Sequence, residues 1–136
     1  MKQTRQRILC VDESADVREM LTALLDAAGY DATAVSAARG AAPSVARDGF
    51  DLFILDRASH ADGGLELCRE LRGRHPDTPI IIYSADVFER HHREAAEAGA
   101  TACVDKPNIN PLVRAVEKLI RRNAGSGSTE RLVSES

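Results

Sequence analysis

The feature that most constrains the fold is an apolar run closed by an acid, Asp51–Asp56 (DLFILD). Apolar residues at consecutive rather than alternate positions are typical of a strand in a parallel sheet whose two faces are both covered. Three further runs have this form, and each leads into polar side chains: Ile8–Val11 into Asp12 and Glu13, Ile80–Tyr83 into Ser84, and Ala102–Val104 into Lys106 and Pro107. Parallel strands end at one edge of their sheet, so we expect these polar groups to converge there.

Helical patterns alternate with these strands, which predicts an α/β domain: a doubly wound parallel sheet with helices on both faces. The helices are expected at Val17–Ala28, Ala37–Arg47, Gly64–Arg72 and Asp86–Ala98, and from Pro111 onward. A weaker strand is expected at Ala32–Val35. Pro43 interrupts the second helix, so we expect a kink or a shortened helix there, and Gly73 is a stop signal for the third.

Length and composition favour one domain over residues 1–124 and a flexible tail over residues 125–136. A chain of this size buries about two-thirds of its unfolded surface and needs no disulfide or metal to fold. From Gly125 the sequence is rich in Gly, Ser and polar residues, which is typical of a flexible linker. Cys10, Cys68 and Cys103 are far apart, and they predict buried thiols in a reducing compartment rather than disulfides.

Charge and hydropathy exclude other classes of protein. The formal net charge of −3 argues against direct binding of nucleic acid. No apolar run approaches the roughly 18 residues of a membrane span. The basic N-terminal residues lead into only a short apolar run, so we expect no signal peptide, no membrane association and a cytoplasmic location.

In this order and at these strand ends, the polar residues resemble the receiver domain of two-component response regulators. The matching positions, within about residues 7 to 122, are Asp12–Glu13, Asp56, Gly64, Ser84–Ala85 and Lys106–Pro107. The resemblance implies a flavodoxin-like sheet of five strands in the order 2-1-3-4-5, which is the order that chemotaxis receivers exemplify. It also implies a cis peptide bond between Lys106 and Pro107.

The resemblance implies a magnesium site as well. By that resemblance Glu13, Asp56 and the backbone carbonyl of Ala58 are direct ligands, and Asp12 acts mainly through water. Crowded carboxylates repel one another, and a divalent cation would keep them ionised. Hard oxygen ligands are those that Mg²⁺ prefers.

The implied activity is phosphoryl transfer in two-component signal transduction. Asp56 would be the phosphoacceptor, a nucleophile that takes a phosphoryl group from the phosphohistidine of a histidine kinase or a histidine phosphotransfer protein. Lys106 would neutralise the phosphoryl oxygens, and the Ser84 hydroxyl would donate a hydrogen bond to one of them. Such a protein catalyses its own phosphorylation rather than acting as a turnover enzyme. Its aspartyl phosphate would change binding to a second copy or a protein target through the face of the fourth helix, fifth strand and fifth helix.

Several positions depart from the family's usual pattern. Cys103 stands where an aromatic residue usually swings inward on phosphorylation, and Ser59–His60 replaces the usual Met-Pro. Together with Pro43, these departures support an alternative, a degenerate receiver that binds partners without phosphorylation. A small phosphatase that uses an aspartyl phosphate is a third hypothesis, but it needs an acid where Ala58 stands. A flavin-binding relative would need a phosphate loop after the first strand, and none is present.

Four histidines suggest a metal site at first sight: His60, His75, His91 and His92. Adjacent residues point apart on a helix, so His91 and His92 are not expected to share a metal. No partner at a spacing of four residues completes a site. We therefore expect all four imidazoles to be solvated.

Overall fold

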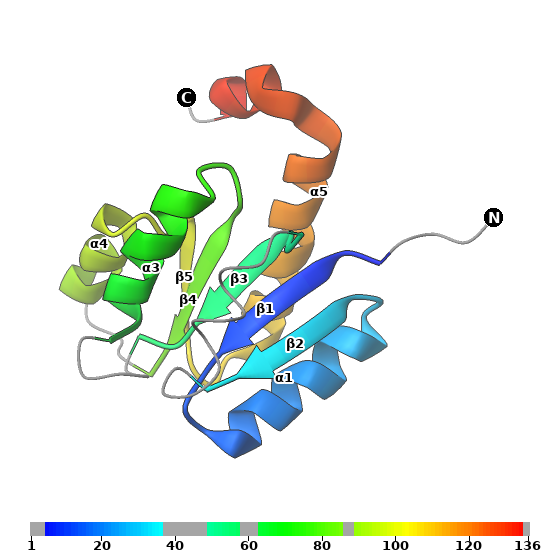
Figure 1. The fold of residues 1–136 in the computed structure, drawn as a ribbon, viewed down its shortest axis with the longest axis vertical. Helices are drawn as coiled ribbons and strands as arrows, with labels where there is room; N and C mark the ends of the chain where they lie inside the picture. Colours follow the sequence, from blue (N-terminus) through cyan, green and yellow to red (C-terminus); the bar gives the residue numbers. More distant parts are fainter. Residues whose placement is uncertain (1–4, 37–48, 58–62, 86–88, 135–136) are drawn as a thin grey trace.

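The computed structural model describes residues 5–36, 49–57, 63–85 and 89–134. Within these ranges the chain forms a five-stranded parallel sheet in the order β2-β1-β3-β4-β5. The strands are β1 (Arg7–Val11), β2 (Asp31–Val35), β3 (Leu52–Leu55), β4 (Ile80–Ser84) and β5 (Ala102–Asp105). The helices are α1 (Ala15–Ala27), α3 (Gly63–Arg74), α4 (Glu89–Glu97) and α5 (Ile109–Ser134). The predicted fold class and strand order are confirmed (Figure 1).

Burial across the sheet follows the apolar runs. Every residue of β3 and β4 is buried, and so is β1 from its second residue onward. These three strands form the centre of the sheet, where helices cover both faces. The edge strands β2 and β5 are only partly buried, in keeping with their shorter or weaker apolar patterns.

The two faces of the sheet carry separate cores, each built on alternate strand residues. On one face, β1, β3 and β4 pack with α1 and α5, which contribute Leu21, Leu25, Leu112 and Val116. On the other face, the intervening strand residues pack with α3 and α4, which contribute Cys68, Leu71 and Ala95. Figure 1 shows α3 and α4 together on one side of the sheet. The strands all end at the same edge, so the residues that follow them are brought into one region.

Helix ends agree only in part with the signals in the sequence. Ser14 caps α1 by accepting a hydrogen bond from the backbone N–H of Val17, and Gly29 follows with a φ of 101°. Gly73, however, does not stop α3, which continues to Arg74. A glycine costs a helix only about 1 kcal/mol, and it ends one only where the backbone turns left-handed. The predicted stop at Gly73 is therefore wrong.

The C-terminal segment continues the last helix of the domain. We expect a flexible tail from residue 125, yet α5 continues through this Gly- and Ser-rich stretch to Ser134. Its last turns project beyond the sheet (Figure 1). Leu112, Val116 and Ile120 bury the first turns of this helix against the sheet, and adding turns to an existing helix costs far less than starting one. The domain boundary at residue 124 stays a prediction.

Two further observations complete the fold. The predicted helix Ala37–Arg47, with Pro43, lies outside the described residues. Within the described ranges, no helix combines the length and the apolar character that a membrane crossing requires.

Candidate functional site

The polar residues that follow the central strands meet at the carboxyl edge of the sheet. The backbone N–H of Asp56 donates to the carbonyl of Val11 (2.9 Å), and the backbone N–H of Lys106 donates to the carbonyl of Ser84 (2.7 Å). These hydrogen bonds continue the ladder by one residue beyond the strands. The positions of Asp56 and Lys106 at the edge of the sheet are therefore fixed by backbone hydrogen bonds.

The centre of the site is the ammonium group of Lys106. Its Nζ lies 2.9 Å from Oδ2 of Asp12 and 3.5 Å from Oδ1 of Asp56. Asp12 and Asp56 are only 2% and 9% exposed. Two carboxylates buried side by side repel each other, and one cation shared between them offsets that repulsion. The structure thus brings together three of the predicted residues around one charge cluster.

Asp12 is held on both sides. Its Oδ1 accepts a hydrogen bond from the backbone N–H of Ser14 (2.9 Å), while Oδ2 accepts from Lys106. The guanidinium of Arg18 donates to the backbone carbonyls of Asp12 (2.7 Å) and Glu13 (3.0 Å). The connection between β1 and α1 is therefore cross-linked to the first turn of the helix. The sequence does not reveal this role of Arg18, because an arginine in a helix carries no local signal of it.

The aromatic ring of Tyr83 lies next to the Lys106 ammonium. The Lys106 Nζ lies 5.6 Å from the centroid of the Tyr83 ring, a distance at which a cation is attracted to an aromatic face. Burial raises the pKa of the Tyr83 hydroxyl; the nearby Lys106 opposes this shift and Asp12 adds to it. From the sequence, Tyr83 is predicted only as a strand residue.

Gly64 packs directly against the backbone of Asp56, the phosphoacceptor candidate. Its backbone N–H donates to the carbonyl of Arg57 (2.6 Å). A Cβ at this position would come into hard contact with the backbone carbonyl oxygen of Asp56. Only glycine lets α3 begin this close to the end of β3, so Gly64 determines where Asp56 sits.

We expect Gly64→Ala to lower the free energy of unfolding by about 1–3 kcal/mol, because the new methyl group must push the Asp56 backbone aside. Gly73→Ala in the same helix is the matched control, since a Cβ there meets nothing within 4 Å. That change should raise the free energy of unfolding by about 0.5–1 kcal/mol through better helix propensity. Urea denaturation measures both. Equal effects of the two substitutions would contradict the packing argument.

No contact recorded for the described residues joins Glu13 to this cluster. The side chain of Glu13 is exposed, and Ala58 lies outside the described residues. Ser84, the last residue of β4, is buried (2% exposed) at the same edge of the sheet. Among the described residues, no three His, Cys, Asp or Glu side chains are grouped as a metal site. The ligand roles of Glu13 and Ala58 stay predictions.

The sequence of this chain matches the response regulator receiver domain over residues 8–117. It is 33% identical over 125 residues to the response regulator MprA of Mycobacterium leprae, an alignment that covers 91% of this chain and 55% of that protein. The chain belongs to the receiver domain family. It spans about half the length of the curated relatives it matches.

Solved receiver structures agree with this assignment. The Mg(2+)-BeF complex of the response regulator TrrA from Thermotoga maritima is 32% identical, with a TM-score of 0.74 and coverage of 84% of this chain and 98% of that one. A CheY-like receiver domain protein from Methanospirillum hungatei is 21% identical and superposes with a TM-score of 0.83. The match covers 91% of this chain and all of that one. At this level of identity, the similarity supports only the fold. The Lys106–Pro107 bond is cis, as predicted.

The donor set of the receiver site suits a divalent metal ion. Asp12 and Asp56 supply carboxylate oxygens 2.9 and 3.5 Å from one ammonium, so their carboxylates lie close together. Their formal charge of −2 exceeds the single positive charge of Lys106. Hard oxygen donors with surplus negative charge are what Mg²⁺ requires. These residues therefore fit the magnesium ion that the sequence analysis expects.

The histidines of the receiver domain are less solvated than expected. His92 Nε2 lies 3.0 Å from Oδ1 of Asp105, and the His75 ring lies 5.4 Å from the ring of Phe53. His91 is partly buried, and its carbonyl accepts a hydrogen bond from Arg57. All three side chains are only partly buried, and that of His92 is 38% exposed, so the expectation of solvated imidazoles holds in part. His60 lies outside the described residues.

The cysteines differ in their surroundings. Cys10 and Cys68 are fully buried, and burial raises their thiol pKa values to about 12 and about 11. Cys103 on β5 is only partly buried and packs against the core cluster of α3 and α4. The prediction of buried thiols is confirmed for the first two cysteines, while Cys103 keeps access to solvent.

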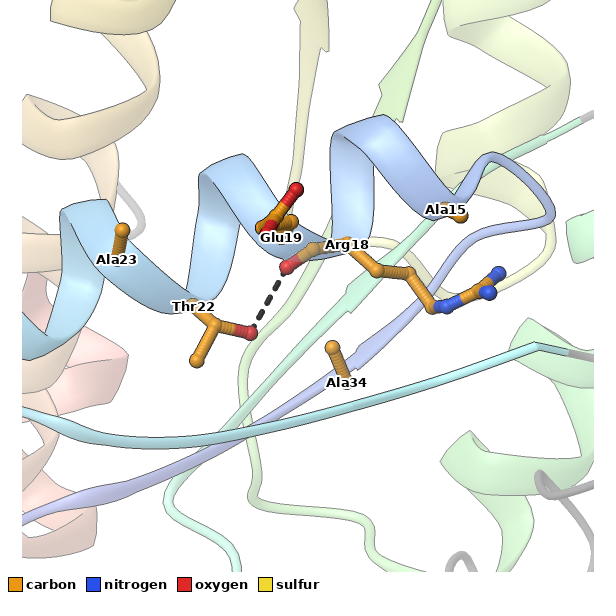
Figure 2. A pocket seen from close by; sticks show the side chains of 6 residues that line it. All are labelled: Ala15, Arg18, Glu19, Thr22, Ala23 and Ala34. Atoms are coloured by element: carbon orange, nitrogen blue, oxygen red, sulfur yellow. Dashed lines mark hydrogen bonds between the residues drawn. The ribbon is translucent and has the colours of Figure 1, made fainter.

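A shallow groove runs between α1 and β2. Its lining residues are Ala15, Arg18, Glu19, Thr22, Ala23 and Ala34 (Figure 2). The Thr22 hydroxyl donates to the carbonyl of Arg18 (2.8 Å), which keeps the threonine side chain along the helix. None of the clustered residues Asp12, Asp56 and Lys106 lines this groove.

Proposed function

We propose that this receiver domain takes a phosphoryl group on Asp56 from the phosphohistidine of a histidine kinase or histidine phosphotransfer protein, in the presence of Mg²⁺. The observation that carries this proposal is the Lys106 ammonium between Asp12 and Asp56. The Asp56 carboxylate is buried and paired with Lys106, so its orientation is fixed by the protein rather than by solvent. Phosphoryl transfer depends mainly on such positioning and on neutralised charge.

The bond changes are simple. An Oδ atom of Asp56 attacks phosphorus, an O–P bond forms, the P–N bond to the donor imidazole breaks, and the imidazole leaves with the electron pair and takes a proton. Lys106 would neutralise a phosphoryl oxygen on Asp56, and the Ser84 hydroxyl would donate a hydrogen bond to another. Asp12 and Asp56, with Glu13 and the carbonyl of Ala58, would hold the metal. When bound, the metal supplies the remaining positive charge for the transferred group.

The proposal extends to the readout. The phosphorylated domain would bind a second copy or a protein target through the face of α4, β5 and α5. Such a shift requires only that the partner binds the phosphorylated form more tightly than the unphosphorylated form. We place this activity in the cytoplasm, where a kinase of this class would present its phosphohistidine.

Intact mass tests the chemistry directly. After incubation with Mg²⁺ and acetyl phosphate, the wild type should gain one phosphoryl group, and Asp56→Asn should gain none. An EDTA control should also gain none. Asp31→Asn makes the same chemical change at an exposed carboxylate at the start of β2 and should behave as the wild type. If the folded wild type gains nothing, the domain is a degenerate receiver that binds partners without phosphorylation.

A further inference from the structure

The described side chains of α4 bury little apolar surface. Among its described side chains, only Ala95 is fully buried, and Ala98, just beyond the helix, is 3% exposed. Burying a methyl group stabilises a contact far less than burying a leucine or phenylalanine. For the described part of α4, polar contacts therefore contribute substantially to its position. Figure 1 shows α4 beside α3, on the same side of the sheet.

The first polar contact joins α4 to the end of β3. Arg57 Nη2 lies 2.5 Å from Oε1 of Glu94, and Arg57 Nη1 donates to the carbonyl of His91 (3.3 Å). The side chain of Arg57 is 18% exposed and that of Glu94 is 45% exposed. Arg57 immediately follows Asp56, so the residue that anchors α4 is covalently next to the phosphoacceptor candidate.

The second polar contact joins α4 to the end of β5. His92 Nε2 lies 3.0 Å from Oδ1 of Asp105. Asp105 pairs with Ser84 in the sheet, and the next residue is Lys106. Each of the two contacts therefore begins at the direct chain neighbour of a site residue. One lies beside Asp56 and the other beside Lys106.

We propose that the pairs Arg57–Glu94 and His92–Asp105 couple the position of α4 to the phosphorylation state of Asp56. The inference rests on the proposed function, because the trigger is a phosphoryl group on Asp56. That group adds a charge of about −1.5 to −2. A guanidinium group binds a phosphoryl group more strongly than it binds a single carboxylate at the surface. Arg57 would therefore leave Glu94 for the phosphoryl oxygens. Movement of Lys106 toward the same oxygens displaces its neighbour Asp105.

This arrangement supplies a readout where the usual aromatic residue is missing. Cys103 cannot swing as a tyrosine or phenylalanine does, but it packs against the core cluster that contains Ala95 and Ala98. When α4 loosens, the Cys103 thiol becomes more accessible. The side chain that replaces the aromatic residue therefore reports the movement of α4 in an experiment.

The rate of Cys103 alkylation at pH 8 tests the proposal. Cys10 and Cys68 are fully buried and protonated at this pH, so the native protein should show one reactive thiol, which Cys103→Ser removes. Glu94→Gln should raise the alkylation rate about two- to fivefold in the unphosphorylated protein, the range expected from loss of one surface ion pair. Glu97→Gln, on the same helix and exposed, is the matched control and should leave the rate unchanged.

Phosphorylation completes the test. The phosphorylated wild type should also be alkylated about two- to fivefold faster, and Glu94→Gln should show little further increase because its pair is already broken. Asp105→Asn tests the second pair in the same way. If mass spectrometry shows phosphorylation but the alkylation rate does not change, the coupling is wrong and the proposed function stands. If no phosphoryl group is gained, both proposals fail.

Discussion

Lys106→Met should lower the free energy of unfolding by about 3 kcal/mol in EDTA, and excess Mg²⁺ should restore much of that loss. Methionine keeps the length of the side chain but removes the charge. Asp12 and Asp56 are then buried together without a cation, whereas the wild type has Nζ at 2.9 and 3.5 Å from them. Removing one partner from a buried ionic group costs more than the group contributes when intact, because uncompensated charge remains.

The comparison with and without Mg²⁺ tests whether the metal binds between these two carboxylates. A divalent cation bound by the same two carboxylates replaces the lost positive charge, so the difference between variant and wild type should shrink as Mg²⁺ is added. Lys118→Met, at an exposed position of α5, is the control and should change stability by less than about 0.5 kcal/mol. Urea denaturation with and without Mg²⁺ measures all three proteins. A loss that Mg²⁺ does not reduce would argue against a metal between these carboxylates.

Arg72→Met should destabilise the domain by about 3 kcal/mol, although Arg72 lies far from the acidic site. Its guanidinium donates to the carbonyls of Gly99 (3.0 and 2.9 Å), His75 (3.0 Å), Pro76 (3.0 Å) and Thr78 (2.8 Å). It thus joins α3, the turn before β4 and the loop before β5. Burial lowers the pKa of Arg72 below its usual value, and at neutral pH the group remains a charged donor.

The geometry explains why neither methionine nor lysine can replace this side chain. A planar fork with five N–H donors reaches carbonyls in several directions at once, and a single ammonium group does not. Arg72→Lys should therefore recover less than half of the lost stability. Arg69→Met changes an exposed arginine one turn earlier in α3 and is the control, with an expected effect within about 0.5 kcal/mol. Similar melting temperatures for Arg69→Met and Arg72→Met would contradict this account.

The helix and strand signals in the sequence were reliable where burial decides structure. Ile8–Val11, Leu52–Leu55 and Ile80–Tyr83 are buried strands because consecutive apolar residues satisfy a sheet covered on both faces. Capping residues were a weaker guide: Ser14 and Gly29 mark the ends of α1, but Gly73 does not end α3. Gly73 lies inside α3, because a glycine ends a helix only when its backbone turns left-handed and its capping hydrogen bonds form.

The sequence by itself determined the parallel sheet, its order through the family resemblance, and the edge at which Asp12, Asp56, Ser84 and Lys106 meet. The sheet and its edge follow from local periodicity and from the rule that parallel strands end together, while the strand order is what the resemblance implies. Only the tertiary structure placed the Lys106 ammonium against Asp12, a residue 94 positions earlier, and paired Arg57 with Glu94. Such contacts depend on side-chain reach and on the packing of elements distant in sequence, which no local pattern encodes.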